Sequence, residues 1–321
     1  MQKIPYYFVC FFLLTFILPT YATSSFVLKT GDKTGTYYQI GADIKKLAKK
    51  YNIIINLVTS NGSLENILTL ANKETIYLGL VQADVLMNFQ DMNKTGELIY
   101  QIDDLSSEKI YDIHKATQAL QVLLPLHREE VHLLTNNRHI LNIKDLTGKK
   151  VVIGESLSGT FTTVSNLLTH FDIHPEKIWL EGGKDALKLL RTHKVDAVFF
   201  VGGAPIQLLK EKVGKKKLYL IPIIDNDIAK SSQNQYDMIN IDKKHYEWQK
   251  KSVKTIGVTS YLMINAKGRS PHQCKYLKKL VKIMSKNLKW LQKKGHPTWK
   301  RVKFSTPIPD VLNKFSCVEE N

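Results

Sequence analysis

Short apolar runs alternate with helix-like patterns along the first third of this chain. Apolar runs of strand length lie at 26–30, 53–59 and 76–81. Each is followed by a segment, such as 36–50, in which apolar residues recur every three or four positions, as they do on one face of a helix. Strands that alternate with helices in this way favour a parallel sheet with helices on both faces, and we therefore expect an α/β fold.

The alternation starts again after residue 148, which indicates a second domain. Strands and helices are expected in turn at 150–153, 160–171, 177–180, 184–192, 195–201 and 206–212. With 321 residues the chain is long enough for two domains, each with a core of its own.

Two segments between these series are typical of crossings from one domain to the other. Residues 122–127 and 131–134 are interpreted as two strands around a first crossing, and 253–264 is a strand-like run suited to a return crossing. Two crossings form a hinge, and a hinge over a cleft lets a binding protein close on its ligand. The expected parts are lobe 1 (23–127 plus 265–321), lobe 2 (128–264) and hinge strands near 122–134 and 253–264.

Two stretches repeat one arrangement, in which a strand leads into a Gly/Ser/Thr turn that opens directly into a helix. They are 26–38 and 150–161. The first amides of a helix have no intrahelical partner and carry partial positive charge, so such a turn can hold a small anion. Two such turns far apart in sequence predict two lobes that close on one ligand.

The N-terminus has the pattern of a secretory signal peptide. Lys3 precedes an apolar run over 6–18, and small residues precede a predicted cut after Ala22, so 1–22 is interpreted as a signal peptide. An uncleaved anchor is the alternative. No later segment approaches the length of a membrane helix, and we expect a soluble periplasmic protein.

The formal net charge of +17 does not by itself indicate a nucleic-acid partner. The lysines are scattered over helix faces, as in 276–294, where they lie opposite an apolar stripe, and a solvated basic face is favoured over an anionic partner. Beyond the signal peptide, Cys274 and Cys317 either pair in an oxidising compartment or remain free thiols.

The motifs of common enzymes are incomplete. Residues 154–158 approach a nucleophile elbow but have Ser158 in place of the last glycine, and 31–35 lacks the Gly-Lys-Ser/Thr of a phosphate-binding loop. The histidines show no metal-ligand spacing. We expect no catalytic residue, no metal and no cofactor.

A set of short motifs resembles the TAXI family, the TRAP-associated extracytoplasmic solute receptors, over nearly all of the chain after the signal peptide. The motifs are Gly35-Thr36-Tyr37-Tyr38, the turn 59–66, Leu80-Val81-Gln82-Ala83-Asp84, 146–151, Ser158-Gly159-Thr160, 196–200 and Gly202-Gly203-Ala204-Pro205. The resemblance implies a bilobed periplasmic binding fold and a TRAP membrane permease as partner. It also implies a small organic anion as ligand, with glutamate, related amino acids and dicarboxylates foremost.

The chain departs from the family pattern at two places. Family members usually have a tyrosine after the leucine in the hinge region, whereas this chain has Leu126-His127, and residues 306–311 only partly match the usual tail. His127 is a candidate hinge contact, a pH-sensitive switch or a buried structural histidine.

The expected ligand-binding residues come from both lobes and share a position at the carboxyl ends of strands or in glycine-rich turns. They are Gly35, Thr36, Tyr37, Asn61, Gly62, Ser63, Gln82, Ser158, Gly159, Thr160, Gly203 and Ala204. For several of them a structural role is the alternative: Tyr37 as a core residue, Ser63 as a helix cap, Gln82 as a helix-start hydrogen bond.

Two other functions stay open at this point. A sensory binding protein that passes a ligand signal to a membrane receptor would have the same fold and pocket. A secreted enzyme is the other alternative, and turnover of the bound ligand would distinguish it.

Overall fold

The computed structural model describes residues 25–72, 77–91, 107–210, 218–231, 235–265 and 270–317. The expected signal peptide, 1–22, and its cut after Ala22 lie outside these residues. In the part of the chain that is described, no helix is both long and apolar enough to cross a membrane.

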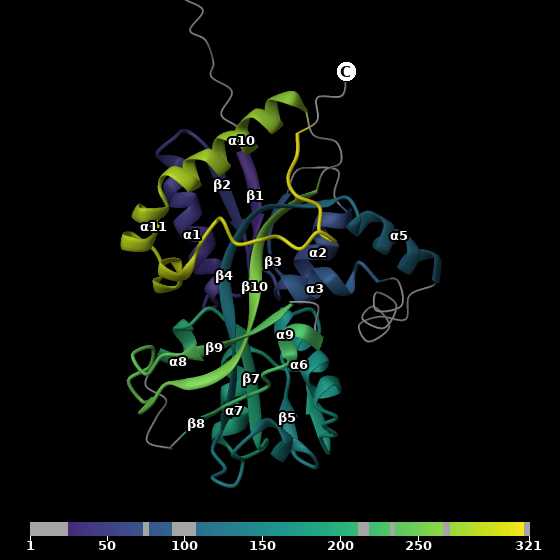
Figure 1. The fold of residues 1–321 in the computed structure, drawn as a ribbon, viewed down its shortest axis with the longest axis vertical. Helices are drawn as coiled ribbons and strands as arrows, with labels where there is room; N and C mark the ends of the chain where they lie inside the picture. The colour runs from purple at the N-terminus through teal and green to yellow at the C-terminus, as the bar shows by residue number, and fades with distance from the viewer. Residues whose placement is uncertain are drawn as a thin grey trace, which may run out of the picture.

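The upper half of the molecule in Figure 1 begins with three parallel strands in the order β2-β1-β3, each followed by a helix. The elements are β1 (Ser25–Lys29), α1 (Thr36–Lys49), β2 (Ile54–Val58), α2 (Ser63–Asn72), β3 (Tyr77–Gln82), α3 (Ala83–Asn88) and α5 (Ser107–Thr117). The buried stripe of α1, with Ile40, Ile44 and Leu47, packs on this sheet, as its spacing predicts.

The lower half repeats the parallel arrangement, with β5 between β6 and β7. The elements are η1 (Ile143–Leu146), β5 (Lys150–Val152), α6 (Gly159–His170), β6 (Lys177–Trp179), α7 (Gly183–Arg191), β7 (Ala197–Gly202), α8 (Gln207–Lys210), β8 (Tyr219–Ile221), α9 (Ile228–Ser231) and β9 (Tyr236–Ile241). The mixed α/β fold expected from the sequence is confirmed.

Two long antiparallel strands, β4 (Leu120–Thr135) and β10 (Val253–Asn265), run through both halves and join them (Figure 1). The interpretation of 122–127 and 131–134 as separate strands was wrong, because β4 is continuous. The polar residues between them interrupt the apolar pattern but not the backbone pairing: Glu130 lies opposite Gly257 of β10 and Gly202 of β7. The register shifts between Thr259 and Tyr261 of β10, where β4 has one extra residue between Pro125 and Arg128, and proline in a sheet is usually found at such irregularities.

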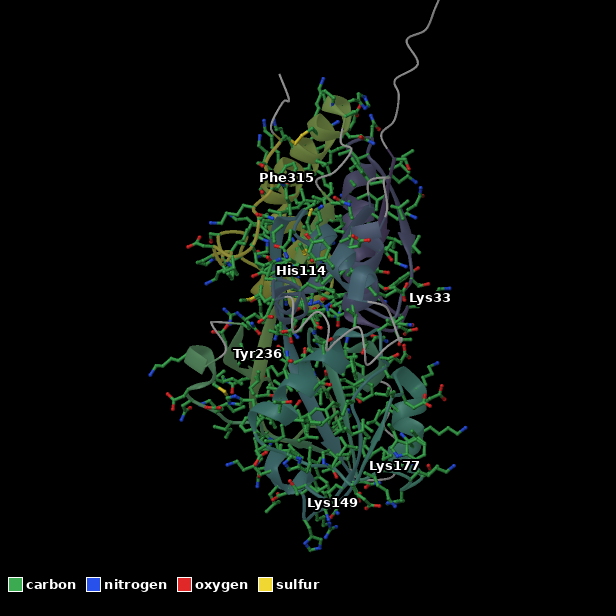
Figure 2. All side chains as sticks on the ribbon, turned by 90° about the vertical axis from the view of Figure 1, so that its right-hand side faces the viewer. Lys33, His114, Lys149, Lys177, Tyr236 and Phe315 are labelled. Atoms are coloured by element: carbon green, nitrogen blue, oxygen red, sulfur yellow. A yellow bond between two sulfur atoms is a disulfide. The ribbon has the colours of Figure 1, made fainter. Side chains whose placement is uncertain are left out.

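The C-terminal segment returns to the upper half and packs on it with α10 (Pro271–Lys286), α11 (Leu288–Lys294) and η2 (Pro297–Arg301). The expected single helix over 276–294 is interrupted at Asn287. Cys274 of α10 forms a disulfide with Cys317 near the chain end. Lys149 and Lys177 lie toward the lower end of the lower half (Figure 2).

Candidate functional site

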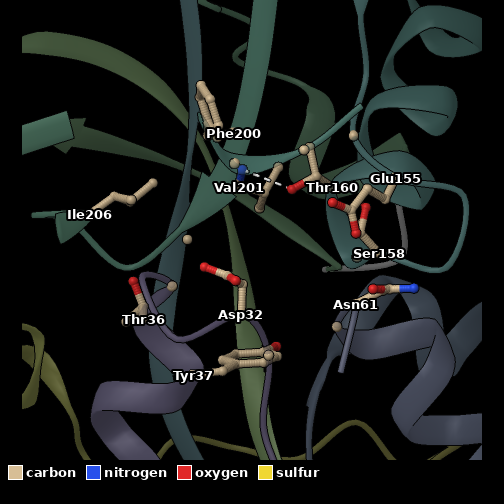
Figure 3. Close-up of a pocket in the computed structure, with 18 of the residues that line it drawn as sticks. Asp32, Thr36, Tyr37, Asn61, Glu155, Ser158, Thr160, Phe200, Val201 and Ile206 are labelled. Atoms are coloured by element: carbon tan, nitrogen blue, oxygen red, sulfur yellow. Dashed lines mark hydrogen bonds between the residues drawn. The ribbon is translucent and has the colours of Figure 1, made fainter. Parts of the chain in front are cut away.

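A pocket of about 150 Å³ lies where the two halves meet, lined by residues of both (Figure 3). Its walls are the loops that follow the carboxyl ends of parallel strands, at Gly31 after β1, Asn61 after β2, Gly154 after β5 and Glu181 after β6. Ligand sites of α/β sheets lie at this edge. Pockets for drug-sized ligands measure about 300–1,000 Å³, so this pocket fits a smaller molecule.

Four helices begin at the pocket wall. The residues that line it at their N-termini are Gly35 to Tyr37 for α1, Gly62 and Ser63 for α2, Ser158 to Thr160 for α6, and Gly182 and Gly183 for α7. No side chain caps α1 or α7, whereas the hydroxyl of Ser158 accepts a hydrogen bond from the amide of Phe161. The uncapped first turns leave amides available to a carboxylate.

The two halves touch each other around the pocket. The hydroxyl of Thr36 in α1 donates to the carbonyl of Gly203, at 3.0 Å, and the amide of Glu65 in α2 donates to the carbonyl of Leu157, at 3.1 Å. The two halves are therefore in direct contact beside the pocket.

Asp84, at the start of α3, adds a buried contact between the halves. Its carboxylate accepts hydrogen bonds from the hydroxyls of Thr163 in α6, at 2.6 Å, and Tyr236 in β9, at 2.9 Å. Burial raises the pKa of Asp84, and these two hydrogen bonds act in the opposite direction.

The inner wall of the pocket is a chain of buried polar side chains. The hydroxyl of Tyr37 lies 3.2 Å from that of Ser63, which donates to Gln82 Oε1 at 3.3 Å and accepts from the backbone amide of Gln82. The side-chain nitrogen of Gln82, Nε2, donates to Oε2 of Glu129 in β4, at 2.9 Å. These residues hold one another in place, so each presents its remaining polar atoms in a fixed direction.

Glu129 is 3% exposed and lines the pocket, although it comes from the shared strand β4. Its second oxygen, Oε1, has no hydrogen-bond partner among the described residues and lies 3.7 Å from Nε2 of His127, which also has none. Burial raises the pKa of Glu129 to about 8, and it lowers that of His127 well below its usual range. This carboxyl group is therefore mostly protonated at neutral pH, and His127 is uncharged.

A second buried cluster lies behind the pocket. Glu130 pairs with Arg301 of η2 and accepts a hydrogen bond from the amide of Ala204, at 2.7 Å. Arg301 also donates to the carbonyl of Ala204, at 3.1 Å. Gly203 lies so close to the ring of His127 that a Cβ there would be 2.9 Å from Nε2. This cluster joins the C-terminal segment, β4 and the loop after β7.

The pocket is acidic, in a chain whose formal net charge is +17. Its lining includes the carboxyl side chains of Asp32, Glu129, Glu155 and Glu181, and no lysine, arginine or histidine is among the described lining residues. Asp32 and Glu155 point into the space between the halves in Figure 3. Burial and then the charges of Asp32 and Glu181 raise the pKa of Glu155. No group of three or more described His, Cys, Asp or Glu residues is arranged to hold a metal ion.

The structure brings together most of the residues that the sequence singled out. The residues found in the pocket wall are Gly35, Thr36, Tyr37, Asn61, Gly62, Ser63, Gln82, Ser158, Gly159 and Thr160. Gly203, Ala204 and His127 are not among the lining residues and belong to the cluster behind it. The hydroxyl of Thr36 is directed to Gly203 rather than into the pocket.

The acidic residues of the wall were missed from sequence. Glu129 carried a signal, because Glu129 and Glu130 stand together in an otherwise buried apolar strand, where charged side chains are rare without a partner or a function. Asp32, Glu155 and Glu181 carried none, because acidic residues in loops are ordinary surface residues.

The sequence profile of the NMT1-like family matches residues 28–308 of the chain. Among solved structures, a protein named Tv2483 bound to L-arginine is similar with a TM-score of 0.51 and 9% identity, over 89% of this chain and 96% of that one. The periplasmic binding protein BugD has a TM-score of 0.51 and 11% identity, over 87% and 85%. A periplasmic binding protein of an arginine transport system from Legionella pneumophila has a TM-score of 0.47 and 13% identity, over 87% and 97%.

Proposed function

Because the chain belongs to the NMT1-like family and has the fold of periplasmic binding proteins, we propose that it is the extracytoplasmic solute receptor of a TRAP transporter of the TAXI type. It captures a small carboxylate between its halves and delivers it to a membrane permease. The observation that carries this proposal is the convergence of four helix N-termini on one small pocket between the halves.

The two lobes of the receptor are residues 23–127 plus 265–321 and residues 128–264, and the hinge lies in β4 and β10. The structure corresponds to the closed form, in which Thr36 and Glu65 of one lobe bond to Gly203 and Leu157 of the other. Opening breaks these few hydrogen bonds and bends two strands, as in other hinged binding proteins. Segment 1–22 directs the chain to the periplasm and is removed after Ala22.

Ligand binding tests this function directly. The mature chain, from residue 23, is expected to gain thermal stability with at least one amino acid or dicarboxylate and to bind it with a Kd near 1 μM, about −8.2 kcal/mol, or below. Thermal-shift screening followed by isothermal titration calorimetry measures both. If no small carboxylate binds, the proposal fails. Loss of uptake of that solute on deletion of the gene separates a transport receptor from a sensor.

Replacing Gly159 by alanine is expected to weaken ligand binding about 5- to 150-fold, because overpacking costs of order 1–3 kcal/mol. A Cβ at Gly159 overlaps the side chain of Gln82 and lies 2.8 Å from the hydroxyl of Ser63, both in the opposite lobe. Alanine suits the first turn of α6, so the open form keeps its stability.

Gly31→Ala is the matched control, since a Cβ at that pocket glycine meets nothing closer than Tyr37 Cβ at 3.4 Å. Calorimetry gives the affinity of each variant, and urea unfolding without ligand gives its stability. Equal affinities in the two variants would show that the lobes do not approach this closely when the ligand is bound.

A further inference from the structure

The carboxyl groups of the pocket form two separate sets. The inner set is Glu129 alone, and the largest charge effects on it come from Asp84 and Glu130 behind the wall. The outer set consists of Asp32, Glu155 and Glu181, and the charges of Asp32 and Glu181 raise the pKa of Glu155. Neither set meets a basic side chain among the described lining residues. A ligand that carries only negative charge would therefore add to the repulsion at the outer set and would meet no compensating charge at Glu129.

The inner set is built to receive a hydrogen-bond donor. Gln82 fixes one oxygen of Glu129 at 2.9 Å, and the hydroxyl of Tyr37 also favours the ionised form of this carboxyl group. The other oxygen, Oε1, has no hydrogen bond among the described residues and lies 3.7 Å from Nε2 of His127. Two arginines of this region are already bonded elsewhere: Arg301 to Glu130 and to the carbonyl of Ala204, and Arg128 to Asp237. A cationic nitrogen that enters from the pocket would favour the ionised form of this buried carboxyl group and lower its pKa.

The outer set is more exposed. Neighbouring residues fix the positions of its carboxyl groups, but none of these neighbours carries a positive charge. Thr34 fixes Asp32 through its backbone amide, at 2.8 Å. Glu155 packs so closely against Gly182 that a Cβ at that position would lie 2.8 Å from Glu155 Cδ. The carboxylates of Asp32 and Glu155 project from opposite halves into the same space in Figure 3, so a cation between them would bind both lobes at once.

We propose that the ligand is an amino acid with a cationic side chain. Its carboxylate binds at the uncapped first turn of α1 and at the start of α6, its α-ammonium group at Glu129, and its side-chain cation between Asp32, Glu155 and Glu181. The inference rests on the proposed receptor function, because it concerns the ligand of the same pocket. It excludes dicarboxylates without an amino group, which the helix N-termini alone would accept.

Calorimetry with four probes on the mature chain, freed of bound solute by unfolding and refolding, tests the ligand class. L-lysine and L-norleucine differ only in the distal amine, whereas L-glutamate and succinate carry a second carboxylate. L-lysine is expected to bind about 10-fold more tightly than L-norleucine and about 100-fold more tightly than succinate. If L-glutamate or succinate binds as tightly as L-lysine, the inference is overturned while the receptor function stands. If none of the probes and no other small carboxylate binds, both fail.

Two variants separate the inner from the outer set. Glu129→Gln is expected to weaken L-lysine and L-norleucine alike, by about 30-fold or more, and to leave the affinity for succinate unchanged or raised. The double variant Asp32→Asn with Glu155→Gln is expected to weaken L-lysine about 10-fold and L-norleucine little.

Glu176→Gln, at an exposed carboxyl group outside the pocket, is the control and keeps the parent affinities. A purely structural role of Glu129 predicts that Glu129→Gln also weakens succinate. An equal loss for L-lysine and L-norleucine in the double variant would show that the outer carboxylates bind no cation. Either result contradicts the inference.

Discussion

Replacing Glu129 by glutamine is expected to raise the free energy of unfolding of the empty protein by about 3–5 kcal/mol at pH 8 and to change it little below pH 4.5. The pKa of Glu129 is about 8 in the folded chain, against an ordinary value of 4.5. Between these values the folded chain holds a proton that the unfolded chain has released. Stability from this carboxyl group is therefore lost as the pH rises through that window, and glutamine does not titrate.

The charged and titratable groups around Glu129 support this direction. The negative charges of Asp84 and Glu130 raise its pKa further, after burial. His127 supplies no compensating charge, because burial lowers its pKa well below the usual range. Hydrogen bonds from Tyr37 and Gln82 act in the opposite direction and are smaller in effect than burial.

Urea unfolding at pH 5, 6, 7 and 8, on the parent chain and the variant, measures this difference. Glu130, with a pKa of about 7, also titrates in both proteins, so the two stability curves are compared with each other and the parent curve is not interpreted alone. Glu176→Gln is again the control, as its carboxyl group is exposed. Parallel stability curves for the parent chain and Glu129→Gln would contradict the raised pKa.

Loss of the disulfide between Cys274 and Cys317 is expected to lower the free energy of unfolding by about 4 kcal/mol, the loop-closure entropy for a sequence separation of 43 residues. The bond holds the chain end beside α10. The segment before it is joined to β4 by few hydrogen bonds, such as those of Val122 to the backbone of Asn313 and Phe315. Without the disulfide the conformational entropy of the unfolded chain increases, and these few hydrogen bonds do not compensate for it.

Replacement of both cysteines by serine, followed by urea unfolding, measures the effect. A reductant should lower the stability of the parent chain to that of the double variant and leave the double variant unchanged. A parent chain that does not respond to reductant would show that the two thiols are not joined in solution.

Much of the fold could be predicted because its elements carry local patterns. The apolar spacing of 36–50 and 160–171 identified α1 and α6, and the turns before them located the two loops that line the pocket. The continuity of β4 could not be predicted, because Arg128, Glu129 and Glu130 interrupt the apolar run. Their backbone groups are nevertheless paired with β10, and tertiary pairing overrides the local pattern.

The residues of the candidate site also include some that could be predicted from the sequence and some that could not. The polar turns of the wall, such as Ser158 to Thr160, were predictable because a helix start has a sequence signature. Gly203 and Ala204 stand in an equally suggestive motif but lie behind the pocket, since the loop after β7 bonds to Glu130 and Arg301. Motif spacing gives the position of a turn along the chain and not the direction in which its atoms point.

The α/β alternation and the two strand–turn–helix loops could be predicted from local patterns, because hydrophobic periodicity and helix starts are local properties. The charge of the pocket, in contrast, depends on how distant segments pack together. Asp32, Glu129, Glu155 and Glu181 come from four different elements or loops and meet because the two halves face each other across β4 and β10. Burial determines the protonation of Glu129, and it depends on residues from many parts of the chain that pack around this side chain. A local sequence pattern therefore does not predict it.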